Sequence, residues 1–308
     1  MDPEFPEPRS LSLRLVCGMR SLAPEFRAVN VSLIVVTLIS VGLYAQETAS
    51  ARKQPGWKLV WSDEFNGPNN SAVDLSKWVF DIGGEGWGNQ ELEYYTSRPQ
   101  NVFIQDGNLV IRAQRENYTG LDGVSKKYTS GRLKTAGKFS QVYGRFEARI
   151  KIPSGQGMWP AFWMLGDNIS SVGWPKCGEI DIMENVGKEP GLVHGSLHGP
   201  MTTGAATDLT STVSLPTGKD FAAAYHLYAV EWEPDAVRFY LDDTLYATFT
   251  ANSVASTPTT AGSWVFDHPY FLILNVAVGG SWPGPPDATT AFPQTMLIDY
   301  VRVYTAKR

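Results

Sequence analysis

Apolar and polar residues alternate with a period of two through much of this 308-residue chain. In the segment GRFEARIKIP (144–153), the apolar residues fall on one face of an extended strand and the charged residues on the other. Residues 236–249 have two such arms around Asp242 and Asp243, which predicts a hairpin. Further strands are expected over 108–115, 226–234, 270–279 and 296–304.

Helical periodicity is confined to a turn or two at 219–225, and the sequence has no internal repeat. Hydrophobic residues make up 43% of the chain and charged residues 19%, which is enough apolar material for a sizeable core. Many short strands joined by Gly- and Pro-rich turns are typical of an all-β fold, namely one antiparallel sandwich or jelly roll.

The first 45 residues are expected to lie outside this fold. Residues 31–45 are uncharged and apolar and follow Arg20 and Arg27, as in a secretory signal peptide, and the run is short for a membrane span. Because about thirty residues precede it, either translation starts at Met19 or the first residues are an added leader; an uncleaved anchor is the other alternative. Residues 46–56 are a polar linker, and 57–305 form the folded domain.

Charge and cysteine content narrow the functional classes. The net charge is −5 and no run of Lys or Arg occurs, which argues against nucleic acid and anionic membrane surfaces as partners. After loss of the leader with Cys17, only Cys177 remains, so no disulfide is expected. Cys177 has no histidine near it in the sequence, which favours a small buried residue over a thiol nucleophile.

Common catalytic signatures are missing from the sequence. It contains no G-x-S-x-G elbow, no Gly-rich phosphate loop and no H-E-x-x-H motif. His194 and His198 are four residues apart, but in a strand-like context broken by glycines. Four strand steps separate Cα atoms by about 13 Å, too far for a shared zinc ion.

The stretch GEIDIMENVG carries three carboxylates. On a regular strand Glu179 and Asp181 would share one face and Glu184 would point to the other. A β-bulge at Ile182 and Met183 would absorb one residue and return Glu184 to the face of Glu179. The two glutamates would then be about 13 Å apart at Cα. If their side chains lean inward, the carboxyl groups come within about 5 Å, as in a retaining glycosidase.

This row of acids suits double displacement at a sugar. Glu179 would attack the anomeric carbon, and Glu184 would act first as acid and then as base. Asp181 would hold a proton near Glu179 and orient it. The alternative is a solvated acidic edge strand, but like charges on one face repel, and the neighbours here are Ile and Met instead of Lys or Arg.

The motif GEIDIME resembles the signature of glycoside hydrolase family 16 in its bulged form, and the likeness covers about residues 57–304. Six stretches resemble the bacterial laminarinase branch, the endo-β-1,3-glucanases: WSDEFNG (61–67), WGNQELEYYT (87–96), SGRLKT (130–135), YGRFEARIKIPSGQGMWPAFWML (143–165), HGSLHGP (194–200) and NVAVGG (275–280). The resemblance implies a β-jelly-roll sandwich of two curved antiparallel sheets, with a substrate cleft along the concave sheet.

The resemblance also assigns site residues by position. Glu179 matches the nucleophile, Asp181 the assisting acid and Glu184 the acid/base, with His198 beside the acid/base or, alternatively, in the core. The residues expected to bind substrate are Asn89, Arg132, Trp159, Trp163, Trp174, His198 and Asn275. The three tryptophans would be stacking platforms for sugar faces, although Trp163 suits the core equally well.

No cofactor is expected for catalysis. The family often carries a structural calcium ion on the convex face, and its ligands would correspond to Glu64, the Gly107 carbonyl and Asp299. Oxygen ligands of this kind suit calcium, and the alternative is that the two acids pair with local backbone amides.

The resemblance therefore predicts a secreted, monomeric enzyme, extracellular or periplasmic, that cuts internal β-1,3 bonds of a β-glucan with retention. A glucan-binding protein of the same fold is disfavoured because both catalytic glutamates are present. Related specificities remain as alternatives, namely mixed-linkage β-1,3-1,4-glucanase or agarase. The bulged motif argues against the lichenase and xyloglucan branches, whereas agarase specificity depends on cleft loops.

Overall fold

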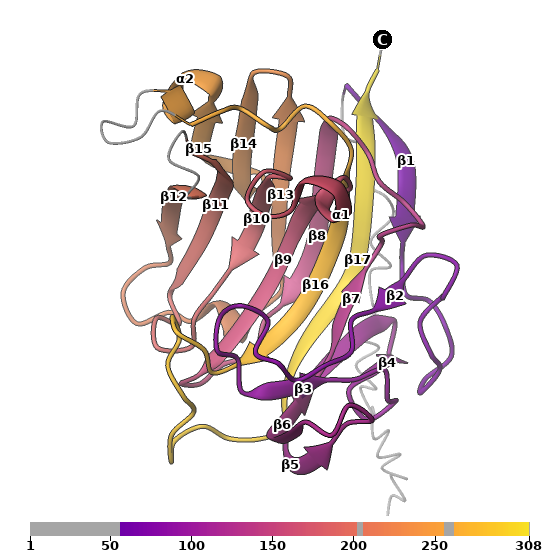
Figure 1. The fold of residues 1–308 in the computed structure, drawn as a ribbon. Coiled ribbons are helices and arrows are strands. Elements are labelled where there is room, and N and C mark those ends of the chain that lie inside the picture. Colours follow the sequence, from indigo (N-terminus) through magenta and orange to yellow (C-terminus); the bar gives the residue numbers. More distant parts are fainter. Residues whose placement is uncertain (1–55, 202–205, 256–261, 308) are drawn as a thin grey trace, which may run out of the picture. The chain divides into compact units, whose positions relative to one another are not determined.

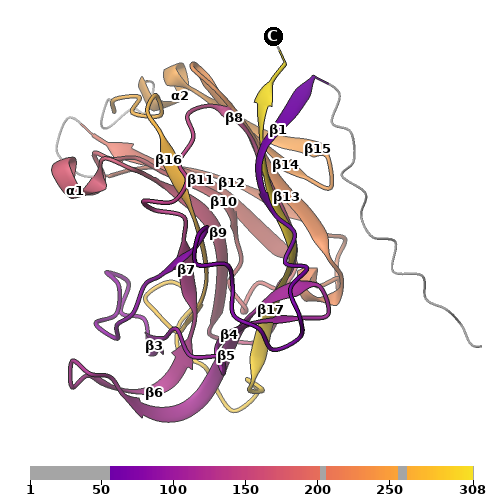
Figure 2. The same ribbon diagram turned by 90° about the vertical axis from the view of Figure 1, so that its right-hand side faces the viewer.

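The computed structural model describes residues 56–201, 206–255 and 262–307. The predicted leader, with its apolar segment 31–45, lies outside the described residues, as does nearly all of the linker. The described part of the chain forms two β-sheets that face each other as layers (Figures 1 and 2). The all-β jelly-roll prediction is confirmed. Within the described residues, no helix combines the length and the apolar character that crossing a membrane requires.

The larger sheet has ten strands. They are β1 (Trp57–Asp63), β3 (Glu93–Tyr95), β4 (Val102–Gln105), β5 (Asn108–Thr119), β6 (Ser125–Ser130), β8 (Gly144–Lys151), β13 (His226–Glu233), β14 (Ala236–Leu241), β15 (Thr244–Thr250) and β17 (Gln294–Ala306). Hydrogen bonds connect them in the order β15-β14-β13-β8-β17-β5-β6-β3, with β1 added on β17 and β4 on β5. The pairing is antiparallel except between β3 and β6, which run parallel, a departure from the purely antiparallel expectation.

The smaller sheet has seven strands. They are β2 (Val79–Phe80), β7 (Arg132–Lys134), β9 (Met158–Gly166), β10 (Glu179–Glu184), β11 (Leu192–Pro200), β12 (Ala206–Ser214) and β16 (Tyr270–Val278). Their order is β12-β11-β10-β9-β16-β7-β2. The described helices are short: α1 (Ile169–Val172), α2 (Ala251–Ala255) and the 3-10 turn η1 (Phe221–Ala223), which lies where the sequence predicts a helical turn.

The core lies between the sheets and follows the period-two pattern. On β8, Phe146, Ala148 and Ile150 are fully buried and face the other sheet. The predicted hairpin is β14–β15, and both turn residues, Asp242 and Asp243, have positive φ, which matches the right-handed twist of the strands. The alternation read from the sequence therefore gives the correct inward face.

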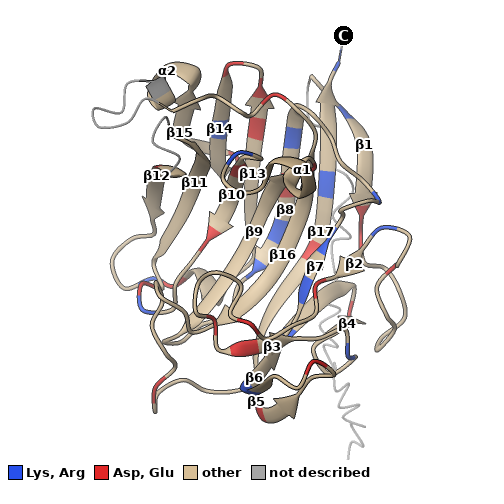
Figure 3. Ribbon diagram, viewed as in Figure 1, with Lys and Arg blue, Asp and Glu red and all other residues tan. Residues whose placement is uncertain are grey.

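The outward face of β8 is less exposed than the sequence suggests. Arg145 and Glu147 are buried although both are charged. Arg145 pairs with Glu147, Glu231 and Asp243. Figure 3 shows positions of both charge signs on neighbouring strands of the ten-stranded sheet. Burial is tolerated here because each charge has partners.

Replacement of Leu274 by alanine should destabilise the fold strongly. Leu274 lies in the middle of β16 with no exposed surface, and its loss would leave a cavity between the sheets. We expect the free energy of unfolding to fall by about 2–5 kcal/mol, measured by denaturant titration. Leu245→Ala on β15, where the side chain is 49% exposed, is the matched control and should change it little. Equal effects of the two substitutions would contradict this description of the core.

Candidate active site

β10 contains one more residue than its neighbour β9 over the same length. Asp181 pairs with Trp163 and Met183 pairs with Phe162, so Ile182 lies between two successive pairs without a partner of its own. The register against β11 shifts in the same interval. This is the β-bulge that the sequence predicts.

The bulge brings the three acids to one side of the seven-stranded sheet. Ile182 and Met183 are 1% and 0% exposed and belong to the core. Glu179, Asp181 and Glu184 line one cleft on the outer face of the sheet. In a regular strand without the bulge, the five steps from Glu179 would turn Glu184 towards the core.

Gly178 fixes the start of this strand. It has a φ of +70°, and a Cβ built on it would lie 1.9 Å from the hydroxyl oxygen of Tyr270. A side chain at this position would therefore clash with a fully buried ring. The close approach explains why glycine directly precedes Glu179.

The cleft has a volume of about 680 Å³. Its lining runs from the loop that holds Trp87 and Asn89, across the sheet, to Ile169 of α1. All ten residues that the sequence proposes for catalysis and substrate binding line it: Asn89, Arg132, Trp159, Trp163, Trp174, Glu179, Asp181, Glu184, His198 and Asn275. The structure thus brings them together, while the contact of each with a sugar stays a prediction.

Two tryptophans hold the two glutamates. The indole N–H of Trp159 donates to Oε1 of Glu184 at 2.9 Å, and that of Trp174 donates to Oε2 of Glu179 at 2.9 Å. Trp174 is 53% exposed, so its ring also presents a free surface to the cleft. Hydrogen bonds to charged groups are stronger than neutral ones, so both bonds favour the carboxylate form.

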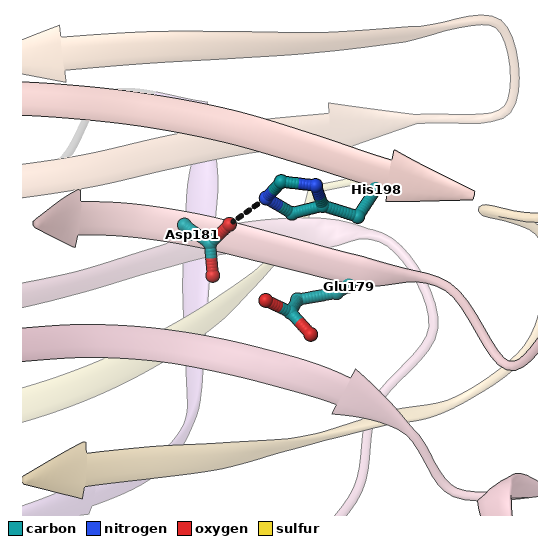
Figure 4. Close-up of side chains that lie close together, drawn as sticks. All are labelled: Glu179, Asp181 and His198. Carbon is teal, nitrogen blue, oxygen red and sulfur yellow. Dashed lines mark ion pairs between the residues drawn. The ribbon is translucent and has the colours of Figure 1, made fainter. Parts of the chain in front are cut away.

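His198 lies on β11 and reaches Asp181 (Figure 4). Its Nε2 is 3.0 Å from Oδ2 of Asp181, and its Nδ1 is 2.6 Å from Oδ1 of Asp208. Burial alone would lower the pKa of His198, but Asp181, followed by Glu179 and Asp208, raises it to about 10. His198 is therefore an imidazolium at neutral pH.

The cluster of Glu179, Asp181 and His198 has the composition of a metal site. One ligand atom from each lies within 4.8 Å of the others. However, both ring nitrogens of His198 face carboxylates as donors, which leaves no nitrogen lone pair for a metal. The cluster does not fit a metal ion and is better described as a carboxyl pair with a cationic neighbour.

Burial raises the pKa of every acid in the row. For Glu184, burial and the charge of Glu179 raise it to about 7, against the Trp159 hydrogen bond and the charge of His198. Burial and Asp181 raise the pKa of Glu179, and burial and Glu184 raise that of Asp181. Three carboxylates held this close do not all ionise at neutral pH.

Glu179 and Asp181 titrate as a pair, because a proton bound by one is hydrogen-bonded by the other. A nucleophilic Glu179 requires the form in which Asp181 holds the shared proton, because the negative charge then lies on Glu179, where the indole N–H of Trp174 stabilises it. In this form Glu179 can act as a nucleophile, and protonated Glu184 can act as an acid. The site then has the two carboxyl roles of a retaining glycosidase.

Arg132 lies between two indole rings. Its Cζ is 4.6 Å from the ring centre of Trp87 and 4.9 Å from that of Trp163, and its Nε donates to Asp81 at 3.0 Å. The Trp163 indole N–H donates to Oδ1 of Asn275 at 2.7 Å. The Trp163 ring is thus part of the cleft wall, in contact with Arg132.

Several residues that line the cleft were not predicted from the sequence. Trp87 and Glu91 lie in the stretch WGNQELEYYT, whose resemblance to the family could have identified them but was used only to propose Asn89. Trp282 meets the Trp159 ring edge-on at 5.4 Å. Asp208 is a single acid in a Ser- and Thr-rich strand, and nothing in the sequence singles it out.

The three proposed calcium ligands belong to strands of the ten-stranded sheet or to the residues next to them, with Asp299 on β17 and Glu64 directly after β1. Both carboxylate oxygens of Glu64 accept from the guanidinium of Arg302, and Oδ2 of Asp299 accepts from Arg149 at 2.8 Å. Gly107 is in the turn between β4 and β5. The acids therefore have arginine partners instead of backbone amides, and an ion at this place would compete with guanidinium groups.

Cys177 is fully buried, and burial raises the pKa of its thiol to about 11. A neutral buried thiol is a poor nucleophile. The structure agrees with the interpretation of Cys177 as a packing residue.

The fold is a β-sandwich, and its cleft holds two carboxyl groups that each accept a hydrogen bond from a tryptophan. These features place the protein in the class of glycoside hydrolases. Residues 89–302 match the model of glycosyl hydrolases family 16, and the chain belongs to this family. The chain is 45% identical over 261 residues to a β-glucanase of Rhodothermus marinus, covering 82% of this chain and 86% of the relative. It is 39% identical over 264 residues to a glucan endo-1,3-β-glucosidase of Cryptopygus antarcticus, covering 81% and 92%.

A solved structure shows the same fold. The laminarinase catalytic domain from Thermotoga maritima MSB8 superimposes with a TM-score of 0.75 at 48% sequence identity, covering 82% of this chain and 99% of that domain. The family assignment made from motifs is therefore confirmed over most of the chain.

The contact between Trp159 and Glu184 should be visible in the pH profile. If Glu184 is the acid that the sequence predicts, it must be protonated to act, so kcat/KM should fall as the pH rises through about 7. Trp159→Phe removes a hydrogen bond that favours the carboxylate, so the pKa of Glu184 should rise and the falling limb should move to higher pH. Trp282→Phe, which alters a neighbouring ring without touching the carboxylate bond, is the control. A limb that stays in place in Trp159→Phe would contradict the role of this hydrogen bond.

Proposed function

We infer that this chain hydrolyses internal β-1,3-glucosidic bonds of laminarin-type β-glucans and retains the anomeric configuration. The observation that carries this inference is the bulge in β10, which places Glu179 and Glu184 on the same side of the sheet with Asp181 between them. The named relatives, a β-glucanase, an endo-1,3-β-glucosidase and a laminarinase, support the substrate class.

The first step joins the sugar to the enzyme. The carboxylate of Glu179 attacks the anomeric carbon, and the bond to the leaving oxygen breaks as Glu184 gives that oxygen its proton. Ester formation removes the negative charge of Glu179. Since this charge helps to raise the pKa of Glu184, its loss favours the ionised form of Glu184.

The second step releases the sugar. Ionised Glu184 takes a proton from water, and the resulting hydroxide attacks the anomeric carbon and displaces the carboxylate of Glu179. Asp181 keeps Glu179 oriented through both steps, with His198 as the balancing positive charge. Two displacements at one carbon restore its original configuration.

The extent of the cleft supports cutting within a chain. From Arg132 on β7 to Asp208 on β12, the lining crosses six adjacent strands. Five strand spacings amount to about 24 Å, longer than one sugar. Tryptophans lie on both sides of the acid row, with Trp174 at Glu179 and Trp159 at Glu184. Sugars on either side of the broken bond therefore have an aromatic surface to pack on.

We also propose that the mature protein is a secreted monomer whose partner is the β-glucan itself and that it makes no stable association with membranes. The support is the signal-like segment 31–45 and the acidic net charge of −5. No cofactor takes part in the reaction scheme, because every proton and bond is handled by Glu179, Asp181 or Glu184.

Parallel digestion of laminarin, barley mixed-linkage glucan and agarose, followed by sizing of the products, tests the function. We expect rapid shortening of laminarin chains, because endo action breaks bonds far from the ends. Release of glucose alone would contradict endo action. Cleavage of agarose in preference to laminarin would show that the substrate is not a β-1,3-glucan.

Glu179→Gln is the matched control for this digestion. It keeps the size of the side chain but removes the nucleophile, so hydrolysis should fall by roughly 10³-fold or more. Melting temperature and binding of laminarin oligosaccharides should persist. Undiminished hydrolysis by this variant would show that Glu179 is not the nucleophile, and the substrate assignment would be unaffected.

A structural calcium ion at Glu64, Gly107 and Asp299 is the last part of the proposal. We expect millimolar calcium to raise the melting temperature by a few degrees and EDTA to lower it, with no change in kcat well below the transition. Glu64→Gln should abolish the response. Equal melting temperatures with calcium and with EDTA would leave the ion pairs to Arg302 and Arg149 as the only role of these acids.

A further inference from the structure

A directional chain of hydrogen bonds leads from the cleft to a buried carboxylate. The indole N–H of Trp163 donates to Oδ1 of Asn275 at 2.7 Å. Nδ2 of Asn275 donates to the hydroxyl of Tyr95 at 3.1 Å, and that hydroxyl donates to Oε2 of Glu91 at 2.8 Å. The last three residues are almost fully buried, and they come from sequence positions up to 184 residues apart, 91 and 275.

The polarity of this chain is set at its buried end. A carboxylate only accepts, so Tyr95 must use its proton on Glu91 and offer lone pairs to Asn275. Burial and then Glu91 raise the pKa of Tyr95 well above its usual range, so the hydroxyl keeps that proton. Asn275 must in turn point its NH₂ group at Tyr95 and its carbonyl at the Trp163 N–H. A flipped amide would place donor against donor at Trp163.

Glu91 is itself held firmly. Its backbone carbonyl accepts from Nζ of Lys126 at 2.8 Å, and its Oε1 faces Nδ2 of Asn89 at 3.4 Å. The neighbouring Glu93 is fully buried, and burial followed by the charge of Glu91 raises its pKa well above the usual range. Burial thus favours the neutral form of Glu93 beside Glu91.

We propose that Glu91 and Tyr95 are positioning residues that fix the amide orientation of Asn275 for the sugar. This inference rests on the proposed function, because Asn275 has a task only if a sugar enters the cleft. With one N–H and one oxygen lone pair already engaged, Asn275 presents its remaining N–H and lone pair in a single arrangement. A glucan hydroxyl then meets a donor and an acceptor whose places do not interchange.

A second consequence concerns Asn89, the other cleft amide. Glu91 contacts Asn89 through one oxygen and Tyr95 through the other. One carboxyl group therefore fixes the orientation of both amides, that of Asn89 directly and that of Asn275 through Tyr95. Both Asn89 and Asn275 line the cleft. The arrangement would recognise the pattern of sugar hydroxyls through two neutral amides.

Tyr95→Phe is the direct test, because it removes one hydroxyl from the chain and keeps the ring. We expect kcat/KM on laminarin to fall about 10-fold, the loss typical of one buried hydrogen bond that positions a binding group. Tyr304→Phe is the matched control: its hydroxyl also donates to a buried glutamate, Glu147, but on the ten-stranded sheet. It should leave kcat/KM unchanged.

A double-mutant cycle separates positioning from simple stability. In the Glu179→Gln background, binding of a laminarin oligosaccharide is measured by calorimetry with Tyr95→Phe, with Asn275→Ala and with both. Since Tyr95 acts through Asn275, its substitution should weaken binding about 10-fold when Asn275 is present and less than about twofold when it is absent. Melting temperatures of the four proteins accompany the affinities.

Each outcome decides the proposal. Equal losses with and without Asn275, or no loss at all, would overturn the positioning role. If Tyr95→Phe does not fold, Glu91→Gln replaces it, because its amide offers donors where the carboxylate offers none. Its loss of affinity should be larger with Asn275 present than without it, and the loss that remains without Asn275 is expected from Asn89. If the unaltered enzyme fails to cut or bind laminarin, the proposed function fails first, which is a distinguishable result.

Discussion

The β-bulge in β10 is the constraint on which the site depends. Five residues separate Glu184 from Glu179, so the bulge decides whether Glu184 lies on the cleft face or turns to the core. The inserted stretch is tolerated because Ile182 and Met183 are both apolar and both find room between the sheets. Gly178 adds a local condition, since the strand starts against the hydroxyl of Tyr270, where no side chain fits.

Once the acids share a face, their mutual repulsion shapes the surroundings. The raised pKa values of Glu179, Asp181 and Glu184 mean that the folded state binds their protons more tightly than the unfolded state does. The contribution of these groups to stability is therefore present below their usual pKa and is lost as the pH rises through the raised values. His198 has the same pH dependence, because the carboxylates raise its pKa to about 10, but in this case protonation creates a charge that they stabilise. The positive charge of His198 therefore reduces the repulsion among the three carboxylates.

Much of this could be predicted from sequence because it depends on local periodicity or on motif likeness. The inward face of β8, the hairpin around Asp242 and the bulge all follow from spacing along one strand. The buried pair of Arg145 and Glu147 did not follow, since its partners Glu231 and Asp243 come from another part of the chain. Three further features could not be predicted for the same reason: the parallel pairing of β3 with β6, the contact of Asp208 with His198, and the hydrogen-bond chain from Glu91 to Asn275. Contacts between distant segments leave no period in the sequence.

The two indole donors at Glu179 and Glu184 have a property that the other partners lack. Arginine, lysine and histidine would bring a positive charge to the row, and a hydroxyl can turn its proton elsewhere. An indole N–H is neutral, points in one direction set by a rigid ring and does not gain or lose protons in water. Trp159 and Trp174 can thus donate to Glu184 and Glu179 in the same direction before and after a proton transfer, so the change of role proposed for Glu184 within one turnover needs no rearrangement around it.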